Sequence, residues 1–131
     1  MVKMMARIRL NNGFTLIELM VAMTIIALLL SIVAPRYIHS VSKAEESVLK
    51  EDLHLMREAL DKYQADTGAY PDTLDDLVNK KYLRKIPVDP VSQSNSTWIL
   101  IPPSNGAKGA IFDIKSGAQG NAKDGSAYGD W

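Results

Sequence analysis

Gly13-Phe14-Thr15-Leu16-Ile17-Glu18 opens a long apolar run and places a carboxylate five residues into it. From Phe14 to Ala34 the only other polar residues are Thr15, Thr24 and Ser31. An acidic residue at the centre of a membrane-spanning helix costs on the order of 3 kcal/mol, so an ionisable residue in such a run indicates a functional role. Glu18 is therefore the first candidate functional residue.

The apolar run is long enough to cross a lipid bilayer. Its 21 residues would span about 32 Å as an α-helix. Lys3, Arg7 and Arg9 precede it, and no acidic residue occurs before Glu18. This asymmetry predicts that the N-terminus stays in the cytoplasm and that the residues after the run are exported. A conventional cleaved signal peptide would have a shorter apolar core followed by a small-residue site.

Composition bounds the rest of the chain. Its 131 residues include no cysteine, and 15 basic residues balance 15 acidic ones. This length allows one small domain beside the apolar run, and the lack of cysteine excludes disulfides and thiolate metal sites. Overall neutrality gives no basic footprint, so we expect no nucleic-acid partner.

Beyond Pro35, apolar residues recur every three to four positions, which predicts an amphipathic helix that continues the first one. Pro35 should kink or loosen the junction, and Gly68 is the expected helix stop. Thr73, followed by an acidic first turn, predicts a short second helix through about Lys80.

The remaining residues predict a small β-sheet. Runs rich in β-formers at 97–101 and 109–114 flank a turn-forming segment at 102–106, which indicates an antiparallel hairpin. Residues 116–131 show no period and predict a flexible end or a loop held by something other than a core. We expect an α+β fold in which a long N-terminal α-helix packs on this sheet. The apolar residues expected to cover the helix are Leu77, Val78, Tyr82, Leu83, Ile86, Trp98, Leu100 and Phe112.

The sequence contains no catalytic constellation. His39 and His54 are isolated, and there is no Ser/His/Asp order, glycine-rich phosphate loop or metal-binding histidine pair. The carboxylates of Glu45-Glu46 and Asp75-Asp76 are adjacent in sequence and so diverge on a helix. We therefore do not expect an enzyme.

The segment Gly13-Phe-Thr-Leu-Ile-Glu18-Leu-Met-Val, with a basic leader before it and Pro35 after it, closely resembles the signal of the type IV pilin and type II secretion pseudopilin superfamily. The resemblance implies that a prepilin peptidase cuts between Gly13 and Phe14 and methylates the new amino group of Phe14. Glycine at the cut lets the backbone lie close to the protease. Glu18 would then pair with the α-amino cation of Phe14 on a neighbouring subunit, which sets register more than it adds stability. The alternative is that Glu18 lies at the membrane interface of an uncleaved anchor, where the helix dipole favours it.

Downstream segments extend the resemblance toward major pseudopilins of the type II secretion system. They are Thr67-Gly-Ala-Tyr-Pro71, Ile86-Pro-Val-Asp-Pro90 and Phe112-Asp-Ile-Lys-Ser-Gly117. Two departures stand out: Val91-Ser follows Asp89-Pro90 where pseudopilins usually have Trp-Gly, and residues 116–120 lack the aspartate often found there.

A calcium ion is commonly held by the C-terminal loop of major pseudopilins. The resemblance places this site first on Asp124 and second on Ser116, in a Gly-rich loop that could wrap the six to eight oxygens that calcium takes. The alternative is that both are ordinary loop residues, because Asp-Gly and Ser-Gly pairs are typical of turns.

The resemblance as a whole implies three segments: a basic leader at 1–13 that is removed, a transmembrane and filament-core helix at 14–35, and a periplasmic head at 36–131. The expected function is that of a structural subunit of a type II secretion pseudopilus, polymerised to drive protein export across the outer membrane. Expected partners are further copies of the chain, minor pseudopilins, the prepilin peptidase and the inner-membrane assembly platform. The subunit would cross the bacterial inner membrane once, with its N-terminus cytoplasmic and its head and filament periplasmic. The alternatives are a type IV pilus subunit used in adhesion, DNA uptake or motility, and a single-pass anchored periplasmic binding module.

Overall fold

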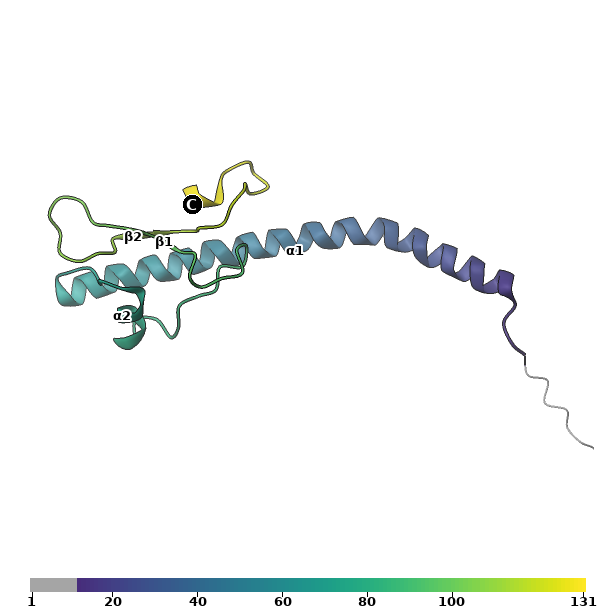
Figure 1. Ribbon diagram of the computed structural model, residues 1–131, viewed down its shortest axis with the longest axis horizontal. Coiled ribbons are helices and arrows are strands. Elements are labelled where there is room, and N and C mark those ends of the chain that lie inside the picture. Colours follow the sequence, from purple (N-terminus) through teal and green to yellow (C-terminus); the bar gives the residue numbers. More distant parts are fainter. Residues whose placement is uncertain (1–11) are drawn as a thin grey trace, which may run out of the picture. The chain divides into compact units, whose positions relative to one another are not determined.

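The computed structural model describes residues 12–131, so residues 1–11 of the predicted leader lie outside the described part. The chain divides into two compact units, Met1–Ile38 and His39–Trp131. The elements in chain order are α1 (Leu16–Thr67), α2 (Leu74–Asn79), β1 (Ile99–Ile101), β2 (Asp113–Lys115) and a 3-10 turn η1 (Tyr128–Asp130) (Figure 1). The expected α+β fold with a long N-terminal helix is confirmed.

The helix α1 has 52 residues and contains Pro35 without ending there. At its start, the Oγ1 of Thr15 accepts a hydrogen bond from the backbone N–H of Glu18 at 3.2 Å, as an N-cap residue does. At its end, Gly68 has a φ of 77° and donates its N–H to the carbonyl of Gln64 at 2.8 Å. This left-handed conformation is the one that glycine favours after a helix. The predicted stop at Gly68 is confirmed.

The first unit exposes its apolar side chains on all sides. From Leu16 to Val33, every large hydrophobic residue is at least 51% exposed. The two hydroxyls inside this stretch bond within the helix, because Thr24 donates to the carbonyl of Met20 at 2.8 Å and Ser31 donates to that of Leu28 at 2.7 Å. By length and composition, α1 is able to cross a membrane.

The second unit packs its core against one stripe of α1. Spacings of four and three residues place the buried side chains of this stripe on a single helix face. They are Leu49, Leu53, Met56, Leu60 and Tyr63, with Ala59 buried beside them. Leu77 of α2, together with Trp98, Ile111 and Ile114, completes the buried cluster. In Figure 1, β1, β2 and the C-terminal residues run along this part of α1.

The short helix α2 begins where the sequence predicts. The side chain of Thr73 accepts from the N–H of Asp76 at 3.3 Å, and Oδ2 of Asp76 accepts from the N–H of Thr73 at 3.1 Å. This reciprocal pair is a complete capping box. The helix ends at Asn79, with Lys80 as its C-cap residue.

The antiparallel pairing of β1 with β2 confirms the expected hairpin, but the strands are shorter than predicted. Phe112 still donates its N–H to the carbonyl of Ile101 at 2.7 Å, but the residues before it bond elsewhere. The N–H of Tyr70 donates to the carbonyl of Lys108 at 2.8 Å, and the N–H of Ile111 donates to the carbonyl of Pro71 at 3.1 Å. Backbone groups that pair with this loop are not available to extend the ladder.

Two of the expected core residues are exposed instead. Leu100 is 43% exposed and Phe112 is 47% exposed, so their assignment to the core was wrong. The expectation treated 109–114 as one strand, in which residues 112 and 114 share a face. Because β2 begins only at Asp113, that alternation does not reach Phe112. The ring of Phe112 instead packs edge-on against the ring of Tyr70, with 5.4 Å between the ring centroids. Ile111 takes the buried position.

Candidate processing and assembly site

The predicted cleavage point lies in exposed, non-helical chain. Gly13 and Phe14 precede α1, and Phe14 is 87% exposed. A side chain added at Gly13 would meet nothing within 4 Å, so nothing in the described fold requires glycine there. An exposed segment with free backbone is the kind of chain that proteases enter. Cleavage between these residues and methylation of Phe14 stay predictions.

Glu18 lies in the first turn of α1. Its backbone N–H is bonded to Thr15, but within residues 12–131 its carboxylate makes no hydrogen bond or ion pair. The N-terminus of a helix favours a negative charge, so this position suits the interfacial alternative. It also leaves two oxygens available to a cation from another chain. The pairing with Phe14 of a neighbour stays a prediction.

Ser116, the second calcium candidate, is fully buried and bonded within the protein. Its Oγ donates to Oδ2 of Asp89 and accepts from the N–H of Ala118 at 3.1 Å. The other oxygen of Asp89 accepts from the N–H groups of Val91 at 2.9 Å and Ser92 at 3.2 Å. Asp89, for which no role was predicted, thus ties its own loop to the residue that follows β2.

Asp124, the first calcium candidate, is exposed and closes a local turn. Its Oδ1 accepts from the N–H of Ser126 at 2.9 Å and from the Oγ of Ser126 at 2.5 Å. These hydrogen bonds, the one from the hydroxyl first, lower the pKa of Asp124. Ser116 and Asp124 therefore have separate partners, and the described residues contain no group of three or more His, Asp or Glu residues that could hold a metal. This arrangement does not fit a calcium site built on the two side chains, and calcium binding stays a prediction.

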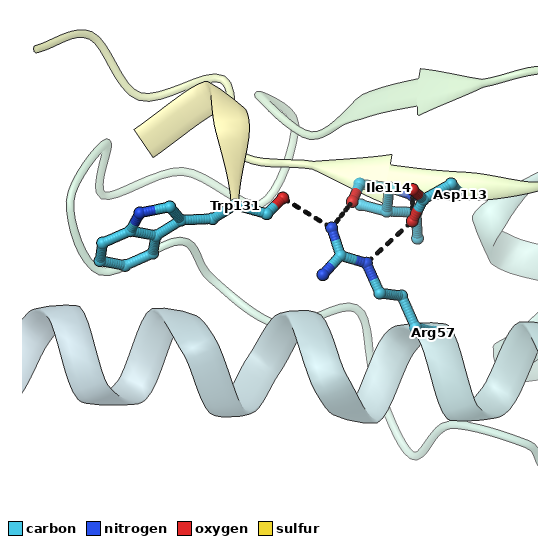
Figure 2. Close-up of polar contacts among 4 residues, drawn as sticks. All are labelled: Arg57, Asp113, Ile114 and Trp131. Carbon is cyan, nitrogen blue, oxygen red and sulfur yellow. Dashed lines mark hydrogen bonds and ion pairs between the residues drawn. The ribbon is translucent and has the colours of Figure 1, made fainter. Parts of the chain in front are cut away.

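Arg57 is the residue that sequence reasoning missed most clearly. Its Nε donates to Oδ1 of Asp113 at 2.8 Å, and its Nη2 donates to the main-chain oxygens of Ile114 at 2.9 Å and Trp131 at 2.7 Å (Figure 2). One guanidinium thus joins α1, β2 and the C-terminal residues. No local pattern marks Arg57, because its partners lie more than fifty residues away in the chain.

A cavity of about 390 Å³ lies beside α1 in the second unit. Leu55, Tyr82 and Lys85 line it together with Asp52. Burial raises the pKa of Asp52, the carboxylates of Asp89 and Glu51 raise it further, and the ammonium of Lys85 opposes them. The described lining holds no histidine, serine or cysteine.

Comparison with known proteins agrees with the sequence resemblance. Residues 8–34 match the family described as prokaryotic N-terminal methylation motif. The chain is 35% identical to the type II secretion system core protein G of Pseudomonas aeruginosa, over 94% of this chain and 96% of the relative. It is 31% identical to the protein of the same name from Aeromonas hydrophila, over 94% of both chains. It is 30% identical to that of Vibrio cholerae, over 97% of this chain and 96% of the relative. No solved structure matches the chain significantly.

Proposed function

We propose that this chain, which belongs to the family of type II secretion system core protein G, is a structural subunit of a type II secretion pseudopilus and serves protein export across the outer membrane. The observation that carries the proposal is similarity over nearly the whole chain to proteins named for secretion. Because none of the relatives described above is named as a pilus protein, the type IV pilus alternative is not favoured.

Processing is the first step of the proposed function. A prepilin peptidase would cut between Gly13 and Phe14 and methylate the new amino group. The exposed chain around the cut supports this step, as does the open space around Gly13. Cutting there would leave Glu18 as the fifth residue of the mature subunit.

Membrane insertion and assembly exploit the exposed first part of α1. Lipid would cover its apolar side chains before assembly, and the helices of sibling subunits would cover them in the filament. Lys3, Arg7 and Arg9 favour a cytoplasmic N-terminus, which places the head in the periplasm. Glu18 would meet the amino group of a neighbouring Phe14, in a buried pair that fixes subunit register. Minor pseudopilins and the inner-membrane platform would be further partners, and an ATPase elsewhere would supply the energy for extraction.

The proposed role is structural rather than enzymatic. Its rival is a single-pass anchored module whose head binds a ligand. The two roles differ in what the N-terminus must be, because an anchor works uncut whereas a filament subunit needs the amino group that cleavage creates.

Mass spectrometry of the protein purified from membranes tests the proposal. We expect a mature chain that begins with N-methylphenylalanine at residue 14. Gly13→Leu should leave the chain uncut and abolish assembly, while the unfolding temperature of the head stays unchanged because the added side chain meets nothing. An intact N-terminus in the wild-type protein would contradict the filament role.

A second comparison isolates Glu18. Glu18→Ala should be cut normally but should assemble poorly in a filament assay. Glu51→Ala is the matched control, because it removes an exposed carboxylate from the same helix. Normal assembly of Glu18→Ala would exclude the proposed pairing without touching the cleavage result.

A further inference from the structure

Residues 121–131, here called the C-terminal strap, lie along one stripe of α1 that borders the core stripe. The strap contacts His39, Glu46, Lys50 and Arg57, which are seven, four and seven residues apart. At 100° per residue, these spacings place the four residues within roughly 40° of one another around the helix. Glu46, Lys50 and Arg57 contribute side chains to these contacts, and His39 contributes its main-chain carbonyl. A segment without an apolar period is thus held by polar groups at helical spacing.

The N-terminal part of the strap is held by one cation, Lys123, and by a carboxylate that two strap residues share. Lys123 donates from its ammonium to the carbonyl of His39, and its N–H donates to Oε1 of Glu46 at 3.1 Å. Oε1 of Glu46 also accepts from the hydroxyl of Tyr128 at 3.2 Å. Burial, followed by this hydrogen bond, raises the pKa of Tyr128, so the phenol stays a donor over the physiological range.

The C-terminal end of the strap is held by contacts of Trp131. The ammonium of Lys50 lies 4.4 Å from the centroid of the indole ring, within the range of a cation–π interaction. The indole N–H donates to Oγ of Ser126 at 2.7 Å, and Oγ of Ser126 donates in turn to Asp124. Asp124 therefore already serves the strap by holding the hydroxyl that orients Trp131.

Arg57 gathers the kinds of oxygen that a calcium ion would gather. Its three acceptors are one carboxylate oxygen, from Asp113, and two main-chain oxygens, from Ile114 and Trp131. Carboxylates and carbonyls are the ligands calcium prefers, and a guanidinium with five N–H donors can collect them in the same way. In Figure 2 this guanidinium points from α1 at the end of β2 and at Trp131.

We propose that the chain's own cationic side chains, Arg57, Lys50 and Lys123, close the C-terminal strap on α1, so that its closure needs no divalent metal ion. The proposal concerns the head alone and does not rest on the proposed function in secretion. It competes directly with calcium binding at Asp124 and Ser116, because both would order the same segment.

Amide hydrogen exchange of the full chain in detergent, measured by mass spectrometry, distinguishes closure by the cationic side chains from closure by calcium. In the wild-type protein, exchange of strap amides should be equal in EGTA and in excess CaCl₂. Arg57→Met should raise strap exchange by roughly tenfold or more, because hydrogen bonds to a charged donor are the stronger kind. CaCl₂ should not restore it. Arg57→Lys keeps the positive charge but loses the planar arrangement of several N–H donors. Its strap exchange should lie between that of the wild-type protein and that of Arg57→Met.

The control variant is Lys62→Met, which removes a cation of α1 that pairs with Glu58 and, among residues 12–131, makes no hydrogen bond or ion pair with the strap. It should leave the strap unchanged. Amides of α1 around Met56 report whether Arg57→Met loosens the whole head. If they exchange faster as well, Lys123→Met gives the local test, with a smaller increase confined to the strap. The proposal is overturned if EGTA opens the wild-type strap, or if neither Arg57→Met nor Lys123→Met differs from the control.

Discussion

The two parts of α1 belong to one helix and use their apolar side chains in opposite ways. In the first unit Leu28 is 63% exposed, whereas in the second unit Leu60 is 0% exposed. Intrinsic helix propensity does not explain this difference, since the two residues are identical. What differs is which residues pack against the helix. Residues of α2, β2 and the loops form a buried cluster with Leu60, whereas Leu28 belongs to no such cluster in the described chain. Apolar residues on every side of a helix therefore indicate a partner outside the chain, and a single apolar stripe indicates a partner within it.

Matched leucine variants test this comparison with the largest expected effect. Leu60→Ala should destabilise the head by about 2–5 kcal/mol, the usual cost of truncating a buried leucine. Leu28→Ala should leave head stability unchanged, because its side chain is 63% exposed and lies outside the buried cluster of the head. Near-UV circular dichroism in detergent, followed through thermal or denaturant unfolding, measures both. Equal destabilisation by the two variants would contradict the division of α1 into covered and uncovered parts.

Local chemistry made the helices readable from the sequence. The cap at Thr73, the stop at Gly68 and the apolar stripe from Leu49 to Tyr63 each depend on neighbours within a few residues. The resemblance of residues 13–35 to the secretion pseudopilins likewise rested on one continuous segment, which the family comparison bears out.

Contacts between distant segments could not be read in this way. Phe112 was misassigned because the N–H groups of Ala110 and Ile111, just before it, donate to the carbonyl of Pro71, about forty residues earlier in the chain. The bond from Ser116 to Asp89 and the guanidinium contacts of Arg57 join segments 27 and 56 or more residues apart. No periodicity of a single element encodes such pairs, so they appeared only once the segments were placed.

Glycine variants test how the cover over the second part of α1 is held. A Cβ at Gly109 would lie 2.1 Å from the carbonyl oxygen of Tyr70, at a φ of 109°. Gly120 has a φ of 95° but open space around it. Gly109→Ala should therefore cost about 3 kcal/mol of head stability, from clash and backbone strain together, and Gly120→Ala about 1 kcal/mol, from strain alone. Denaturant unfolding of each variant gives the difference. If Gly109→Ala cost no more than Gly120→Ala, docking of residues 108–111 on the Tyr70–Pro71 loop would contribute little to the cover.

The smallest effect concerns a carboxylate at the edge of the covered face. Burial, Asp89 and Glu51 raise the pKa of Asp52 above its ordinary value, so the folded protein binds this proton more tightly than the unfolded chain does. Ionised Asp52 therefore opposes folding at neutral pH, and the opposition fades as pH falls through the folded pKa toward the unfolded value of about 3.9.

Asp52→Asn removes that charge in every condition. The variant should be slightly more stable than the wild-type protein at pH 7, and the gap should close as the pH falls toward 4, because the wild-type carboxyl then becomes neutral as well. Asp61→Asn removes a charge of the same sign from an exposed position of the same helix that is not among the groups shifting the pKa of Asp52, and it controls for net charge. Unfolding temperatures measured across this pH range give the result. A variant less stable than the wild-type protein at pH 7 would mean that the carboxylate has a favourable partner. The part of α1 that packs against the head would then accommodate a charged side chain as readily as the exposed first part does.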